Sequence, residues 1–193
     1  MIITANNFKH FVPRDRTLPY HNRLVGKHVA DIFFDEGVIS VTDPCYNEEE
    51  WYRLNDLKIV PGNYQVNVYT DPSEGGSFIL QIVLTDESVI DAFESADQNI
   101  NRSWRVLNWS IGVDAGICGF FQNKPDFSDV EWIKFCNAIS WSDDGYMWNG
   151  DLPSEKGYFC NSGYGDGVYT VHAIRRPVRG KRTPRIVALE LRF

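Results

Sequence analysis

The sequence lacks several features that mark familiar protein classes. Its longest apolar runs, such as SFILQIVL at 77–84, are far shorter than the roughly 20 residues that a membrane-spanning helix needs. The first residues, MIITANNFKHFVPRDR, show no basic segment followed by an apolar stretch and a small-residue cleavage site. We therefore expect an intracellular protein, in the cytoplasm rather than in a membrane.

Sequence motifs of common enzymes are also missing. There is no phosphate-binding G-x-x-x-x-G-K-[ST], no G-x-S-x-G, no H-E-x-x-H and no dinucleotide fingerprint. The few cysteines include no C-x-x-C pair, which argues against a zinc ribbon or a thiol-exchange motif. We expect buried free thiols, while two disulfides or a dispersed four-thiolate zinc site are the alternatives for Cys45, Cys118, Cys136 and Cys160.

The residues that are present predict one folded domain. The chain has 193 residues, of which 43% are hydrophobic and 14% aromatic, enough to form a substantial core. Residues 1–27 show no sustained period and contain Pro13 and Pro19, so we expect an irregular arm there. Residues 28–193 are expected to form the β-rich body of a single domain.

Alternating segments indicate an α+β fold that is mainly antiparallel β, either a sandwich or a strongly bent sheet. Residues 28–46 read as a hairpin that turns at Asp35-Glu36-Gly37, with the glycine in a left-handed conformation. Further strands are predicted at 57–70, 77–86, 109–121, 168–174 and 185–193, the first two and the last two pairing with each other.

Two short helices and one loop complete the prediction. Asn47 is a suitable cap for a helix over 47–54, and Ser128 with Glu131 forms a capping box for a helix over 128–139. Residues 140–157 are polar, aromatic and glycine-containing, which indicates a loop.

Three stretches resemble a family of uncharacterised bacterial and bacteriophage proteins, domain of unknown function 4241. They are SVTDPCY at 40–46, IGVDAGICGFF at 111–121 and NSGYGDGVYTVHA at 161–173, and the last contains the signature S-G-[YW]-G-D-G-x-Y. The resemblance covers about residues 38–193. It implies a β-rich fold and a phage or bacterial setting, but no activity. Thr170 departs from the proline common in that family, and RRPVRGKRTPR at 175–185 is an insertion.

Asp166 lies between two glycines and has two interpretations. The simpler one is that Gly165 and Gly167 take positive φ and the carboxylate accepts hydrogen bonds from the amides of its own turn. The alternative is that Asp43, Asp114 and Asp166 converge on calcium or magnesium, since carboxylate oxygens are the ligands that these ions prefer.

Cys45 and His172 are the candidate reactive side chains. Cys45 could be a nucleophile if a histidine approached it, but a small buried hydrophobe is the more ordinary role. Strand alternation places Tyr169, Val171 and Ala173 toward the core and His172 on the opposite, more polar face, so we expect a surface or interface histidine.

Charge is unevenly distributed along the chain. The sequence contains 26 acidic and 19 basic residues, a net charge of −7, yet Arg175–Phe193 holds seven of the basic residues and only one acid, Glu190. A basic segment on an acidic body suggests an anionic partner or ligand. The candidate contacts are the basic side chains and three aromatic ones that could stack on a ligand: Arg175, Arg176, Arg179, Lys181, Arg182, Arg185, Trp141, Tyr146 and Trp148.

The sequence thus favours a non-enzymatic binding protein that captures a host or bacterial protein or a small anionic ligand such as a nucleotide. A counter-defence, immunity or inhibitor role fits the phage or bacterial setting that the resemblance implies. The acidic body argues against broad DNA binding, which needs a wide basic face. Two alternatives stay open: a calcium- or magnesium-dependent hydrolase or lyase that uses the three aspartates with Cys45 or His172, and a structural or assembly component of a virion. Oligomeric state is not predicted.

Overall fold

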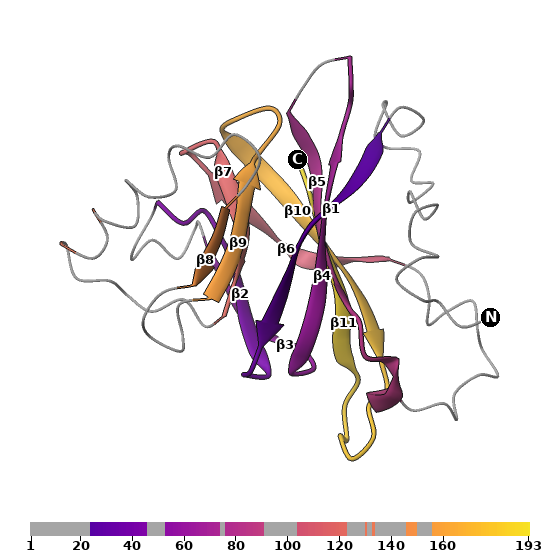
Figure 1. The fold of residues 1–193 in the computed structure, drawn as a ribbon. Coiled ribbons are helices and arrows are strands. Elements are labelled where there is room, and N and C mark those ends of the chain that lie inside the picture. Colours follow the sequence, from indigo (N-terminus) through magenta and orange to yellow (C-terminus); the bar gives the residue numbers. More distant parts are fainter. Residues whose placement is uncertain are drawn as a thin grey trace.

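The fold consists of two antiparallel β-sheets in a computed structural model (Figure 1). Strand accounts for 68% and helix for 4% of the residues that the structure describes, which confirms the predicted β-rich fold. These residues are 24–45, 53–73, 76–90, 104–122, 130, 133, 146–149 and 156–193.

Six strands form the larger sheet and five the smaller one. The six-stranded sheet has the order β1 (Val25–Phe34), β4 (Gly62–Thr70), β5 (Ser77–Leu84), β11 (Arg185–Arg192), β10 (Gly167–Arg176) and β6 (Arg105–Val113). The five-stranded sheet has the order β3 (Arg53–Lys58), β2 (Val38–Thr42), β7 (Ile117–Phe121), β9 (Lys156–Asn161) and β8 (Tyr146–Asn149).

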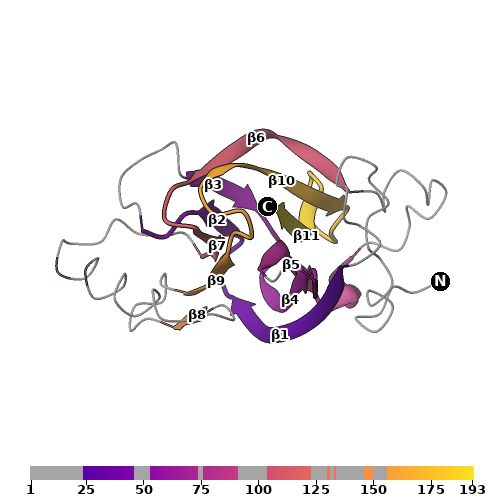
Figure 2. The same ribbon diagram turned by 90° about the horizontal axis from the view of Figure 1, so that it is seen from above.

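The two sheets share one hydrophobic core. Figure 2 shows the larger sheet curving round one side of the molecule from β1 to β6, with the smaller sheet beside it. Alternate side chains of β4, β5, β10 and β11 point into this core, where they meet side chains of β2, β7 and β9. Large and fully buried members from both sheets include Tyr64, Ile82, Ile39 and Phe120.

The predicted strand pairs at 57–70 with 77–86 and at 168–174 with 185–193 are confirmed. β4 pairs with β5 from Tyr64 opposite Leu84, and β10 pairs with β11 from Thr170 opposite Arg192. The strand predicted at 57–70 begins later than expected: Leu57 and Lys58 belong to β3 in the smaller sheet, and β4 begins at Gly62.

The predicted hairpin over 28–46 is wrong. β1 pairs with β4 in the larger sheet, whereas β2 pairs with β3 and β7 in the smaller one, so the turn at Asp35-Glu36-Gly37 carries the chain from one sheet to the other. Gly37 does not have the positive φ that the hairpin required. Instead its carbonyl accepts a hydrogen bond of 3.1 Å from the backbone N–H of Ile59, which fixes the crossing.

The segment at 109–121 is likewise two strands rather than one. β6 ends at Val113 and β7 begins at Ile117 in the other sheet. Gly116 between them has φ 66°, a left-handed conformation that glycine adopts without steric cost. The VDAG motif at 113–116 therefore forms the link from the larger sheet to the smaller one.

The predicted helices lie mostly outside the described residues. Of the helix over 128–139, Val130 and Ile133 are described and both are helical. Of the helix over 47–54, only the last two residues are described, and Arg53 and Leu54 open strand β3, so the helix does not extend that far. A 3-10 turn, η3 (Glu87–Val89), follows β5.

Candidate functional site

Asp43 ties together the turn that contains the VDAG motif. The side chain is fully buried at the end of β2, and its Oδ2 accepts hydrogen bonds of 2.9 Å from the backbone N–H groups of both Asp114 and Ala115. Oδ1 accepts a third, of 3.0 Å, from the N–H of Cys45. Burial raises the pKa of the Asp43 carboxyl, while the three donated hydrogen bonds act to lower it.

Asp166 does not have the role expected from its glycine-flanked position. Its side chain is exposed, and among the described residues no hydrogen bond involves its carboxylate. The turn is held instead by Ser162 and Tyr169, whose hydroxyl groups both donate to the carbonyl of Gly165, at 2.6 and 2.7 Å. Gly165 has the expected positive φ, 81°, but Gly167 does not. The amide-accepting role predicted for Asp166 belongs to Asp43.

The three aspartates do not form an evident metal site. Asp43 is buried and already accepts three backbone donors, whereas Asp114 and Asp166 are exposed. Within the described part of the chain, no group of three or more His, Cys, Asp or Glu side chains is arranged to hold a metal ion. The three donated hydrogen bonds therefore give Asp43 a role in joining two turns.

The S-G-Y-G-D-G turn packs against the start of β5. The N–H of Gly163 donates to the carbonyl of Ser77 at 2.7 Å, and a Cβ on Gly163 would lie 2.5 Å from that same oxygen. Tyr164 stacks edge-on against Phe78 with ring centroids 5.3 Å apart. Only glycine permits this approach of two backbones, which explains the residue type.

The described cysteines are free thiols, as predicted for them. Cys118 and Cys160 lie directly opposite each other on β7 and β9 and are both buried, whereas Cys45 is half-buried; Cys136 lies outside the described residues. Burial raises the pKa of the Cys160 thiol to about 12, and raises that of Cys118, with a further increase from the nearby Asp43 charge. Such thiols are poor nucleophiles near neutral pH.

His172 is buried, which corrects the expected surface position. Its side chain is 5% exposed and lies on β10 directly opposite Glu190 of β11, on the face of the larger sheet that points away from the shared core. Its Nε2 lies 3.1 Å from the Thr170 hydroxyl. Cys45 follows β2 of the other sheet, so the two candidate reactive side chains belong to different layers. Tyr169, Val171 and Ala173 face the core, as predicted.

His172 is one end of a row of polar side chains that crosses five neighbouring strands. We call this the polar row: its members are paired in register from one strand to the next, and they are His28, Asn67, Gln81, Glu190 and His172. Asn67 donates to Gln81 at 3.3 Å, and Gln81 donates to Glu190 at 3.3 Å. The Nε of the buried Arg192 donates to the other oxygen of Glu190.

Sequence reasoning missed the polar row because its members are far apart in the chain. Gln81 within SFILQIVL, for example, gives no sign of the two strands that pair with it. A signal was nevertheless present, because a charged residue inside an apolar strand, such as Glu190 within VALELRF, needs a partner when it is buried.

The basic segment forms the hairpin between β10 and β11. The basic hairpin comprises Arg175–Arg185 and projects from one end of the larger sheet (Figure 1). Arg175, Arg179, Lys181 and Arg182 are exposed, while Arg176 and Arg185 are half-buried. Gly180 at the tip has φ 75°, and the Arg179 N–H donates to the Val89 carbonyl at 3.2 Å, which holds one side of the hairpin against η3.

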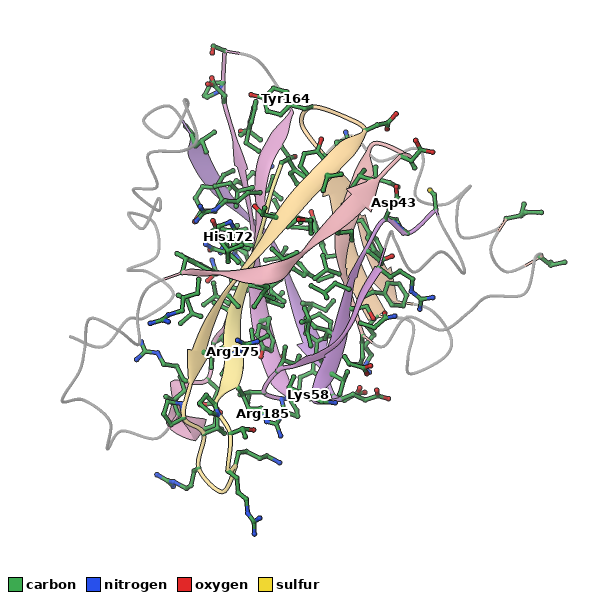
Figure 3. All side chains as sticks on the ribbon, turned by 180° about the vertical axis from the view of Figure 1, so that it is seen from behind. Asp43, Lys58, Tyr164, His172, Arg175 and Arg185 are labelled. Carbon is green, nitrogen blue, oxygen red and sulfur yellow. The ribbon has the colours of Figure 1, made fainter. Side chains whose placement is uncertain are left out.

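Most cations of the basic hairpin have no anionic partner within the described chain. None of the following forms a salt bridge or side-chain hydrogen bond with another described residue: Arg175, Arg179, Lys181, Arg182 and Arg185. Figure 3 shows Arg175 and Arg185 at the end of the molecule opposite to Tyr164. The basic hairpin and the glycine-rich turn are therefore at opposite ends of β10.

The aromatic residues expected on a loop beside this surface lie elsewhere. Tyr146 and Trp148 belong to β8, the strand at the edge of the smaller sheet, rather than to a loop. β8 pairs with β9, with Trp148 opposite Gly157. Trp141 lies outside the described residues. The structure does not bring these aromatic positions and the basic hairpin into one sheet.

Comparison of the chain with protein-family models, with curated proteins and with solved structures gave no match. None of the helices in the described residues is long and apolar enough to span a membrane.

Proposed function

We propose that this protein is a binding protein that captures an anionic partner through the basic hairpin. The observation that carries the proposal is a set of cations without counter-ions in the described chain, on a protein whose net charge is −7: Arg175, Arg179, Lys181, Arg182 and Arg185. Unpaired arginines gain more from an incoming anion than arginines already in salt bridges, because no internal pair has to be broken.

The backbone of the basic hairpin is held in place by the rest of the protein. Its backbone is fixed on both sides, by the β10–β11 ladder and by the hydrogen bond from Arg179 to Val89. A held hairpin loses less conformational entropy on binding than a free segment would. The proposed partner is therefore an acidic protein surface or a small anionic ligand, and it need not induce the hairpin.

The other roles considered from the sequence have less support. A metal-dependent hydrolase would use Asp43, but that carboxylate is occupied by three backbone N–H groups. Cys45 follows β2 in the smaller sheet, whereas His172 of β10 lies on the face of the larger sheet that points away from the shared core. A phage or bacterial setting and a counter-defence role belong to the proposal through sequence resemblance alone.

Binding to immobilised polyglutamate and to tripolyphosphate, each measured at two salt concentrations, tests this proposal. We expect the wild-type chain to bind at low salt and Arg179→Ala/Arg182→Ala to bind more weakly, since two exposed charges are removed. Lys27→Ala/Arg105→Ala is the matched control, because it removes two exposed cations from β1 and β6. Binding of neither anion by the wild type would refute the proposal, and so would equal losses in the two variants.

A further inference from the structure

The five cations of the basic hairpin that lack counter-ions in the described chain lie at two positions along it. Arg175 and Arg185 are at the base, where β10 ends and β11 begins (Figure 3). The other three flank Gly180, at the tip. The last paired residues of the two strands are separated by residues 177–184, so the tip can lie up to about 13 Å beyond the base, at about 3.3 Å per residue.

Contacts with the rest of the protein keep the tip and the base apart. Val178 is buried in the shared core and forms an antiparallel bridge with Ile90, which follows η3. The Lys181 N–H donates to the Val178 carbonyl at 3.0 Å, and the Arg179 N–H donates to the Val89 carbonyl at 3.2 Å. Because these contacts hold the turn, the cations of the tip cannot fold back onto those of the base.

The basic hairpin projects from the protein and does not enclose a small ligand. Small-molecule sites are concave and bury about 70–90% of the ligand surface. The hairpin instead projects from the end of the larger sheet, with Arg175 at its base and Lys181 at its tip both exposed (Figure 1). Single exposed ion pairs contribute little to affinity, so binding here needs several contacts at once. A suitable partner is therefore long enough to contact both the base and the tip.

The charge of the rest of the chain restricts which extended anion can approach. Residues 175–185 contain six basic and no acidic residues, so in a protein of net charge −7 all other residues together carry −13. Nucleic acid carries a negative charge at every nucleotide, and a strand longer than the hairpin would meet the acidic body and be repelled. An acidic segment of a protein can have its charges only where the hairpin lies.

We infer that the basic hairpin binds a short acidic segment of a partner protein, which lies along the hairpin from base to tip. Five of the six basic residues are arginines, whose guanidinium groups form paired hydrogen bonds with carboxylates. An extended peptide advances about 3.3 Å per residue, so about four to six residues cover the distance from base to tip. This inference rests on the proposed anion capture and specifies its partner.

End-capped glutamate peptides of about two to twelve residues test this inference, with tripolyphosphate as the compact anion. Affinities for the full chain are measured by calorimetry at low salt. We expect affinity to rise steeply with length up to about six residues and to change little beyond, because further residues have no cation to contact. The peptide of about eight residues should bind at least about tenfold more tightly than tripolyphosphate.

Two double variants of equal net charge compare the base with the tip. They are Arg175→Gln/Arg185→Gln at the base and Arg179→Gln/Arg182→Gln at the tip. We expect each to weaken binding of the peptide of about eight residues by at least about fivefold, since that peptide contacts both positions. A loss in only one of the two variants would indicate a compact site and overturn the inference; if that variant is the tip one, anion capture stands.

Lys27→Gln/Arg105→Gln is the control of equal net charge, and its affinity should stay within about twofold of the wild type. Thermal unfolding shows that each variant is folded, and Arg175→Gln replaces the base variant if it is not. Tripolyphosphate binding as tightly as the peptide would overturn the inference but leave anion capture intact. A single-stranded oligonucleotide binding more tightly than the peptide would do the same. If the wild type bound neither peptide nor tripolyphosphate, the inference and the proposed function would both fall.

Discussion

Asp43 and Ala115 are 72 positions apart in the sequence, yet the Oδ2 of Asp43 accepts a hydrogen bond of 2.9 Å from the backbone N–H of Ala115. The same oxygen also accepts a hydrogen bond from the backbone N–H of Asp114. A side chain at the end of β2 therefore fixes the turn that links β6 to β7. This bond joins two of the three motifs that stand out in the sequence, DPCY and VDAG.

Replacing Asp43 by alanine should destabilise the fold strongly. Three backbone N–H groups would lose their acceptor in a buried place, and each such loss costs about 1–3 kcal/mol. We expect a loss of at least about 3 kcal/mol in the free energy of unfolding, measured by urea denaturation. Asp166→Ala, at an exposed carboxylate of the glycine-rich turn, is the control and should cost less than about 1 kcal/mol. Similar losses in the two variants would contradict the role given to Asp43.

Gly119 should not tolerate a side chain. A Cβ at this position of β7 would lie 2.0 Å from the carbonyl oxygen of Tyr158 on the neighbouring strand β9. Because the obstacle is backbone, relief requires the neighbouring strands β7 and β9 to move apart, and we expect Gly119→Ala to yield little folded protein. Gly180→Ala meets no atom within 4 Å and bears only the strain of φ 75°, so its cost should be about 1 kcal/mol. Circular dichroism and thermal unfolding would show the difference.

The thiols should react in an order set by burial. Cys45 is half-buried, whereas Cys118 and Cys160 are buried with raised pKa values, so at pH 8 iodoacetamide should modify Cys45 and spare the other two. Peptide mass spectrometry identifies the modified residues, and labelling in urea is the control in which all three should react. Rapid modification of Cys160 in the folded protein would contradict its position between the sheets.

Stability should fall in alkaline solution through buried tyrosines. Burial raises the pKa of Tyr69 to about 12, and also raises that of Tyr64. Above pH 10 the unfolded chain releases these protons while the folded chain retains them, so the free energy of unfolding decreases as pH rises from about 10 to 12. For Tyr69 the loss is of order 2 kcal/mol, since one pKa unit corresponds to about 1.4 kcal/mol. Unfolding of Tyr69→Phe should show a correspondingly weaker dependence on pH in this range.

Much of the fold could be predicted from local sequence. The pairs β4–β5 and β10–β11 are consecutive strands with short connections, and their alternating residues indicate which side faces the core. The separation of β1 from β2 could not be predicted, because the turn at Asp35-Glu36-Gly37 looks the same whether the chain folds back or crosses to another sheet. The partners that decide the crossing, Asn67 and Phe121 among them, are distant in sequence.

The candidate sites divide in the same way. The cations of the basic hairpin are contiguous in the sequence and could be identified there, but the parallel bridge from Ile59 to Ile186, which brings the end of β3 to the base of the hairpin, could not. The polar residues along β10 predicted an exposed His172. In the structure His172 is buried, and its polar neighbours in the polar row, Glu190 and Gln81, come from two other strands. Asp166 could be recognised as a turn residue, but not which hydroxyl groups hold its turn.

The polar row also constrains how the larger sheet assembles. Side chains alternate between the two sides of a strand, so a register shift of β11 by one residue would place the carboxylate of Glu190 in the hydrophobic core that contains Val66 and Leu80. An ionised group stranded there has no compensating donor, and the misaligned sheet is disfavoured by several kilocalories per mole. The variant Glu190→Leu would lose this energetic penalty, and its β11 could pair with the neighbouring strands in more than one register.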